Sequence, residues 1–180
     1  MKKLILISIS VIVFFVVFVL VILFLFPIKY RHQVEYFSEK YGLSESLVAS
    51  VINIESRYDK KAISEVGAKG LMQIMDSTAD ECIRKLGIAE TWDIFDVEDN
   101  MEVGCFYLKY LLDIFEGNVI NALCAYNWGL GNVRSWIDAG NCDVAGNITN
   151  IPVNETANYI KKYKVCYWVY SKIYNYNVEA

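Results

Sequence analysis

The sequence predicts an all-α domain behind a single N-terminal transmembrane helix. Three features of the chain support this fold class. An apolar run over residues 4–26 is long enough to cross a membrane. In the remaining chain, apolar residues recur at helical spacing, without the period-two alternation that indicates a strand. Glycine, asparagine and proline separate the helical segments, as is typical of turns.

The apolar run is interrupted only by Ser8 and Ser10 and ends at Pro27. At about 1.5 Å per residue it reaches roughly 34 Å, which exceeds a hydrocarbon core of about 30 Å. A cleavable signal peptide has a shorter apolar region followed by small residues, whereas this run ends in LFLFPIKYRH. We therefore expect an uncleaved membrane anchor over residues 1–31 and one further domain over residues 32–180. Two basic residues flank the run on each side, so their charge does not predict its orientation.

Composition argues against several classes of function. The net charge is −4 and the basic residues are scattered, so we expect no nucleic-acid partner. The only histidine, His32, lies beside the apolar run, which disfavours His-dependent triads and metal sites, and no metal or cofactor is expected. Five cysteines without a C-x-x-C pair favour small buried residues over a disulfide framework. Four of them lie in helical patterns: Cys82, Cys105, Cys124 and Cys166.

The first helices of the domain are predicted from their capping residues. Ser44 can cap a helix that carries Glu45 in its first turn and continues to about Tyr58. Two glycines then indicate a loop. Ser77 can cap the next helix, which Gly87 ends.

The second half of the domain continues the same pattern. A long helix begins at Asp96 or Asp99 and stops near Gly117. Further helices are expected over residues 118–127, 132–139 and 154–174, with a polar loop over 140–152. No repeat or linker divides this region, so we predict a single helical domain.

A carboxylate, Glu55, lies on the apolar face of the helix that follows Ser44. At about 100° per residue it projects near Val51, Ile52 and Tyr58. Burial disfavours the charged form and would raise the pKa of Glu55 to about 6 or higher, which suits a proton donor near neutral pH. Periodicity fits equally well an acid that ends the helix and either points into solvent or pairs with Arg57 or a distant lysine.

Two other segments contain residues that suit a carbohydrate cleft. SEVGAKGLMQI, residues 64–74, has two glycines followed by Met72 and Gln73, and CAYNWGLGNV, residues 124–133, places Tyr126 and Asn127 at a helix end. Sugars present apolar ring faces and polar edges, which aromatic, methionine and amide side chains can line. Each segment alone also fits an ordinary turn or core.

Taken in order, four motifs resemble the soluble-type lytic transglycosylase (SLT domain) family, relatives of goose-type lysozyme. The motifs are ES at residues 55–56, S-x-x-G-A-x-G-L-M-Q at 64–73, AYN-x-G at 125–129 and IP-x-x-E-T-x-x-Y at 151–159. The resemblance implies a lysozyme-like helical catalytic domain. It implies that Glu55 is the catalytic acid and that the following residues bind substrate: Ser64, Met72, Gln73, Tyr126, Asn127, Glu155 and Tyr159.

Two positions depart from the family pattern. Asp76 stands where the family usually has proline, and it can alter the start of the following helix. Trp128 replaces a small residue after the AYN motif; it either adds a stacking surface or packs in the core, and we favour the core.

The resemblance implies a peptidoglycan lytic transglycosylase. Such an enzyme cleaves the β-1,4 bond between N-acetylmuramic acid and N-acetylglucosamine and leaves a 1,6-anhydromuramic end, with Glu55 acting first as acid and then as base. The alternatives are a goose-type lysozyme-like hydrolase and a non-catalytic glycan-binding membrane protein. Because peptidoglycan lies outside the cytoplasmic membrane, we expect a single-pass protein with its domain on the extracytoplasmic side.

Overall fold

The protein is described by a computed structural model that covers residues 2–87 and 92–172. Within these residues the chain forms helices and loops, and the only strand-like pairings are three isolated β-bridges. The all-α fold class is therefore confirmed. The helices are α1 (Lys2–Leu25), α2 (Arg31–Tyr41), α3 (Glu45–Ser56), α4 (Asp76–Leu86), α5 (Val97–Ile114), α6 (Val119–Trp128), α7 (Leu130–Asp138) and α8 (Asn154–Lys172).

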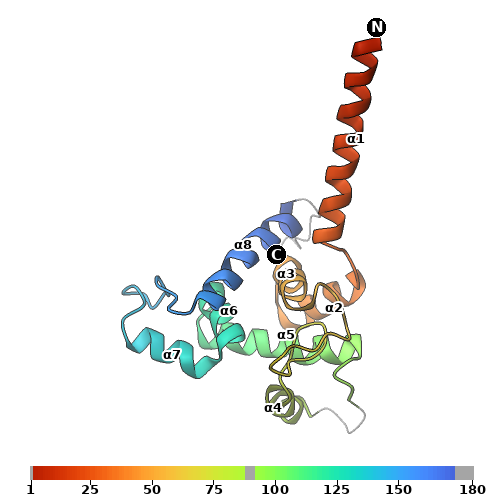
Figure 1. Ribbon diagram of the computed structural model, residues 1–180. Coiled ribbons are helices and arrows are strands. Elements are labelled where there is room, and N and C mark those ends of the chain that lie inside the picture. The colour runs from red at the N-terminus through yellow and green to blue at the C-terminus, as the bar shows by residue number, and fades with distance from the viewer. Residues whose placement is uncertain (1, 88–91, 173–180) are drawn as a thin grey trace.

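Helix α1 extends away from the other helices, which pack together below its C-terminal end (Figure 1). Its segment Ile7–Leu25 has a mean hydropathy of 3.4 and is long and apolar enough to cross a membrane. Large apolar side chains project outward along it, and Phe14 and Phe24 are 74% and 77% exposed. A continuous apolar surface of this kind is unfavourable in water and favourable in lipid.

The C-terminal end of α1 is fixed to α3 and α8. Asn53 of α3 donates a hydrogen bond from Nδ2 to the Leu25 carbonyl at 3.2 Å. Tyr170 of α8 donates its hydroxyl to the Pro27 carbonyl at 3.0 Å, and its ring meets Phe26 edge-on with centroids 6.3 Å apart. The apolar helix is thus joined to the domain by side-chain contacts as well as by the backbone.

The core lies between α3 and the helices that surround it. Helix α3 packs against α2 and α8, while α5 packs against α2, α4 and α6, and α6 also contacts α7 and α8. Val48, Val51 and Ile52 of α3 are fully buried, so this helix lies deep in the domain. Its C-terminal turn, which carries Glu55, is consequently held from several sides.

Two predicted caps, at Ser44 and Asp96, are present in the structure, and Asn118 forms a further cap that was not predicted. The Ser44 hydroxyl accepts a hydrogen bond from the Leu47 amide, and Asn118 caps α6 through the Asn121 amide. Asp96, one of two alternatives for the start of α5, accepts hydrogen bonds from the next turn. Each cap satisfies amides that have no partner within their helix.

The prediction that Ser77 caps α4 is wrong. The helix begins one residue earlier, at Asp76, with Met75 at the cap position and no side-chain cap. Asp76 lies in the first turn, where a carboxylate interacts favourably with the helix dipole, and it pairs with Lys69 at 2.8 Å. The residue at the position where the resembled family has proline is thus the first residue of this helix.

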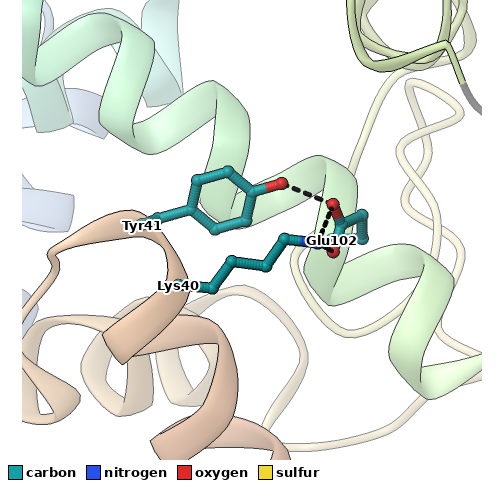
Figure 2. Close-up of polar contacts among 3 residues, drawn as sticks. All are labelled: Lys40, Tyr41 and Glu102. Carbon is teal, nitrogen blue, oxygen red and sulfur yellow. Dashed lines mark hydrogen bonds and ion pairs between the residues drawn. The ribbon is translucent and has the colours of Figure 1, made fainter.

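Helix α2 was not predicted as a separate element. Its sequence, RHQVEYFSEKY, is mostly polar and buries only Val34, Phe37 and Ser38. Contacts from a distant helix hold it in place, as Figure 2 shows: Glu102 of α5 accepts hydrogen bonds from Lys40 at 2.7 Å and from the Tyr41 hydroxyl at 2.6 Å. Such long-range pairing leaves little periodic signal in the local sequence.

The cysteines that were expected to be buried are buried, and all five in the chain are free thiols. Burial raises the pKa of Cys82 to about 11 and that of Cys124 to about 12. Thiols with such high pKa values are poor nucleophiles near neutral pH. These side chains therefore serve as small packing residues.

Candidate active site

Glu55 lies in the last turn of α3 and faces α8. The hydroxyl of Tyr159, which is 6% exposed, donates a hydrogen bond to Glu55 Oε1 at 2.8 Å. The two residues are 104 positions apart in sequence, so only the packing of α3 against α8 brings them together. Glu55 is half-buried and is turned toward α8, so it does not point freely into solvent.

The surroundings of Glu55 keep its carboxyl group partly protonated near neutral pH. Burial raises the pKa of Glu55 from 4.5 to about 7, whereas the Tyr159 hydrogen bond and the positive charge of Lys162 lower it. Burial is the largest of these effects because removing a carboxylate from water disfavours its charged form. A group with a pKa near 7 can donate and accept a proton at similar cost.

The loop between α3 and α4 is held beside this acid by two polar side chains, half-buried Ser56 and buried Asn100. The Ser56 hydroxyl donates to the Leu71 carbonyl at 2.8 Å. Asn100, a fully buried residue of α5, accepts from the Met72 amide at 2.8 Å and donates to the carbonyls of Lys69 and Ile94. No pattern in the sequence indicates Asn100, because its role depends on contacts with a loop about 30 residues earlier.

Gly70 is required where this loop approaches α5. Its φ of 77° lies in the left-handed region, and a Cβ added there would fall 2.2 Å from Asn100 Nδ2. Gln73 also has a positive φ, of 51°, and its Nε2 donates to the carbonyls of Gly70 and Ala62 at 2.9 and 3.2 Å. A strained residue that is held by such bonds is common at functional sites.

Tyr126 connects the loop to α6. Its hydroxyl donates to the Met72 carbonyl at 2.8 Å, and the centroid of its ring lies 5.5 Å from the centroid of the Tyr107 ring. Burial raises the pKa of Tyr126 well above its usual value, and the negative charge of Glu55 is the next cause. The phenol therefore stays protonated close to the acid.

Met72 differs from the expectation that it lines the cleft. Its side chain is fully buried, with the sulfur 3.9 Å from Cys105 Sγ, and a Cβ on Gly104 would meet that sulfur at 2.4 Å. In this structure its side chain packs in the core. Its backbone instead supplies the carbonyl that orients Tyr126.

Asn127 is oriented by α8. Its Oδ1 accepts a hydrogen bond from the hydroxyl of Thr156, a fully buried residue, at 2.7 Å. This bond leaves the two amide protons of Asn127 available to a ligand. Thr156 belongs to the fourth motif but was not singled out, because no pattern indicates which neighbour a buried threonine will reach.

A cavity of about 250 Å³ lies beside Tyr126 and Asn127. Trp128 is half-buried and forms part of its wall, so the favoured prediction that Trp128 packs in the core is wrong and the stacking alternative fits better. Glu55 itself is not among the wall residues of this cavity, nor of a larger cavity elsewhere that also lacks Tyr126. The wall of the smaller cavity comprises Gln73, Ile74, Met75, Thr78, Tyr107, Tyr126, Asn127, Trp128 and Gly129.

Ser64 and Glu155 have no described contact with Glu55. The Ser64 hydroxyl oxygen accepts from the Ala68 amide at 2.9 Å and so shapes its own loop. Glu155 is exposed in the first turn of α8, one turn before Tyr159. Of the predicted site residues, Tyr159 bonds to Glu55, and Tyr126 lies near enough for the charge of Glu55 to raise its pKa.

The charged group that shifts the pKa of Glu55 is Lys162, and no carboxylate does so. Retaining glycosidases place two carboxyl groups only about 5–5.5 Å apart. This site instead offers one carboxyl group, two phenols and an amide. Within residues 2–87 and 92–172, no group of three or more His, Cys, Asp or Glu side chains could hold a metal ion.

Two relatives with a similar sequence are longer than this chain. It is 34% identical over 141 residues to the soluble lytic murein transglycosylase of Salmonella typhimurium, a match covering 76% of this chain and 22% of that protein. It is 34% identical over 116 residues to the membrane-bound lytic murein transglycosylase C of Edwardsiella ictaluri, covering 58% and 32% respectively. The chain thus spans about a fifth to a third of the length of these relatives.

Solved structures of similar proteins share the fold. An inactive glutamate-to-glutamine mutant of the lytic transglycosylase Slt from Pseudomonas aeruginosa aligns with a TM-score of 0.75 and 29% identity, over 85% of this chain and 25% of that one. The 70-kDa soluble lytic transglycosylase in complex with bulgecin A aligns with a TM-score of 0.75 and 32% sequence identity. This alignment covers 83% of this chain and 25% of that one. The family model named Transglycosylase SLT domain matches residues 33–142, more than half of the sequence, and the chain belongs to this family.

Proposed function

We propose that the protein is a membrane-anchored lytic transglycosylase that cleaves peptidoglycan between N-acetylmuramic acid and N-acetylglucosamine. The observation that carries this proposal is the pairing of Glu55 with Tyr159, in which burial raises the pKa of a lone carboxyl group to about 7. Membership of the SLT family, and the lytic murein transglycosylases among its relatives, support the choice of reaction and substrate.

Glu55 performs both proton transfers in the proposed reaction. Protonated Glu55 gives its proton to the glycosidic oxygen as the bond from that oxygen to C1 of muramic acid breaks. The resulting carboxylate then takes the proton of the C6 hydroxyl of the same sugar while the C6 oxygen bonds to C1. The products are a 1,6-anhydro end and a free hydroxyl, and no water is consumed. A pKa near 7 suits this alternation of acid and base.

Tyr159 and the positive charge of Lys162 stabilise the carboxylate that forms between the two transfers. Both lower the pKa of Glu55 and so oppose the effect of burial. Without them the acid would remain protonated and could not accept the second proton easily. Tyr159 also fixes the direction of the carboxyl group, because its hydroxyl is held at 2.8 Å.

The remaining candidate residues are proposed to hold the glycan. Gln73, Tyr126 and Asn127 line the cavity of about 250 Å³, where an aromatic ring and amides suit sugar faces and acetamido groups. The Ser64 hydroxyl oxygen accepts a hydrogen bond from the Ala68 amide, so the hydroxyl proton can be donated to a sugar oxygen. Exposed Glu155 is proposed to contact the glycan at the edge of the site.

Glu55→Gln tests the proposed reaction. The variant keeps the shape of the side chain but cannot donate the proton, so release of muropeptides from purified peptidoglycan should fall by about 100-fold or more. Glu65→Gln, which changes an exposed acid on the following loop, is the matched control and should retain activity. Full turnover by Glu55→Gln would contradict the assigned role.

Mass spectrometry of the products distinguishes the reaction from hydrolysis. A transglycosylase leaves an anhydro end, which is lighter than the reducing end left by a hydrolase by the mass of one water. Binding of glycan without any product would instead identify a non-catalytic binding protein. Reducing ends in place of anhydro ends would overturn the proposed reaction while leaving the acid in place.

We also propose that α1 spans the cytoplasmic membrane once, with the domain of residues 32–180 on the extracytoplasmic side, where peptidoglycan lies. The apolar surface of Ile7–Leu25 and the membrane-bound relatives support this placement. A reporter fused to the C-terminus and active only outside the cytoplasm should be active. Activity of a reporter that works only in the cytoplasm would contradict the topology.

A further inference from the structure

A second cavity lies where the end of α1 meets α3 and α8. Its volume of about 410 Å³ is in the range of small-ligand sites. It includes neither Glu55 nor any wall residue of the cavity beside Tyr126. The wall comprises Leu25, Phe26, Asn53, Ile54, Arg57, Lys161, Lys162, Val165 and Cys166.

The polar part of this wall is cationic. It contains Arg57, Lys161 and Lys162 and no acidic residue. The ion pairs between described residues use other basic side chains. Lys161 makes a long hydrogen bond of 3.5 Å to the neutral side chain of Asn158, which leaves its charge uncompensated. Three gathered positive charges attract an anion.

A buried acceptor in the same wall also lacks a donor. Asn53 is 6% exposed, and its Nδ2 donates to the Leu25 carbonyl at 3.2 Å and to Cys166 Sγ at 3.5 Å. Because the Leu25 carbonyl can only accept, this contact fixes which end of the amide carries the protons. Asn53 Oδ1 is then buried without a hydrogen-bond partner among the residues that the structure describes. A ligand hydroxyl would satisfy it.

The position of the cavity indicates where its ligand comes from. Leu25 and Phe26 form the end of the apolar helix, so the cavity lies at the proposed membrane surface. Val165 and Trp168, three residues apart on α8, are 56% and 57% exposed. Tryptophan is enriched where protein surfaces meet lipid head groups. The cavity and the exposed face of α8 therefore lie at the level of the head groups.

We propose that this cavity binds the head group of an acidic phospholipid that carries free hydroxyls, of which phosphatidylglycerol is the simplest example. The phosphate would contact Lys161, Lys162 and Arg57. A head-group hydroxyl would donate to Asn53 Oδ1, and the start of the acyl chains would pack on Phe26 and Val165. The site would fix the orientation of the domain on the membrane.

The test uses the full chain in detergent with an equimolar mixture of phosphatidylglycerol and phosphatidylcholine, followed by native mass spectrometry. The protein should retain phosphatidylglycerol in preference. Lys161→Gln with Lys162→Gln should reduce that preference on the order of tenfold. The matched control, Lys164→Gln with Lys172→Gln, removes the same charge from exposed positions of the same helix outside the cavity. This control should keep the preference for phosphatidylglycerol.

Three results would overturn the proposal. If both lysine double variants lost the preference for phosphatidylglycerol equally, the lipid would be held by general charge attraction and not by this cavity. Equal retention of phosphatidylglycerol and phosphatidylcholine by the wild type would exclude a site for an acidic head group. Displacement of the lipid by excess inorganic phosphate would indicate a site for a free anion. Phosphatidic acid, which lacks the head-group hydroxyls, should be retained less well than phosphatidylglycerol by the wild type, and Asn53→Leu should abolish this difference.

The proposal rests on the membrane anchor proposed above, but its test does not measure glycan cleavage. A chain without lipid preference could still release anhydro-muropeptides, and an inactive chain could still bind lipid. Thermal unfolding of each variant identifies any that fails to fold. The two lysine double variants remove the same charge from different positions of α8, so their comparison does not depend on the Asn53 variant. Because Lys162 also lowers the pKa of Glu55, the two variants are compared by lipid retention and not by glycan cleavage.

Discussion

Replacing Glu55 by glutamine should stabilise the protein above neutral pH while it removes activity. In the wild type the folded chain raises the pKa of this acid from 4.5 to about 7, chiefly through burial. The folded state therefore binds the proton more tightly than the unfolded state. Its contribution to stability is fully present below pH 4.5 and is lost as the pH rises through 7.

The size of this loss follows from the two pKa values. They differ by about 2.5, and each pKa unit corresponds to about 1.36 kcal/mol, so Glu55 costs the folded state about 3 kcal/mol at pH 8 relative to pH 4.5. Glutamine has nearly the shape of the protonated acid and carries no charge at any pH. For a chain of this length, about 3 kcal/mol corresponds to roughly 6–12 °C in Tm.

Thermal unfolding of the full chain in detergent at pH 4.5 and pH 8 measures this effect. At pH 4.5 the Glu55→Gln variant should have the same Tm as the wild type. At pH 8 its Tm should be well above that of the wild type. Glu65→Gln, which removes an exposed acid, should show no such divergence. If the difference between Glu55→Gln and the wild type were the same at both pH values, folding would not raise the pKa of Glu55.

Three further predictions test the neighbours of the acid. Tyr159→Phe removes a hydrogen bond that lowers the Glu55 pKa, so the pH at which peptidoglycan cleavage declines should rise by about one unit, whereas Tyr163→Phe, one turn further along α8, should leave it unchanged. Gly70→Ala, where a Cβ falls 2.2 Å from a buried amide, should lower Tm more than Gly67→Ala, which has open space at a similar φ. Thr156→Val should raise KM for glycan more than it lowers kcat, because it releases a cavity-wall amide.

The helices of the domain could be predicted because they depend on local signals. The caps at Ser44 and Asp96 and the glycine that ends α4 are short-range features, and each is present in the structure. Helix α2 lacked such a signal, since charged contacts with Glu102, more than 60 residues away, hold it in place. The order of the helices could therefore be predicted from the sequence more readily than the contacts that stabilise each helix.

The candidate site was only partly predictable, for a related reason. Periodicity could place Glu55 on an apolar face but could not tell burial from exposure at a helix end, because Tyr159 comes from a helix 104 residues later. Motif order suggested Met72 as a lining residue, yet which side of a loop a methionine faces depends on the packing of Gly104. Asn100 gave no signal at all, since a buried amide is recognised only by its partners.

Helix α8 connects the acid to the proposed membrane anchor. Near its start Tyr159 holds Glu55, and near its end Tyr170 binds the Pro27 carbonyl at the exit of α1 (Figure 1). Helix α3 makes the same connection, with Glu55 at its last turn and Asn53 bonded to Leu25. With α1 spanning the membrane, two packed helices would hold the acid at a fixed height above the lipid. Cleavage would then be confined to glycan close to the membrane, and loosening the Tyr170 contact should widen that zone without changing the chemistry at Glu55.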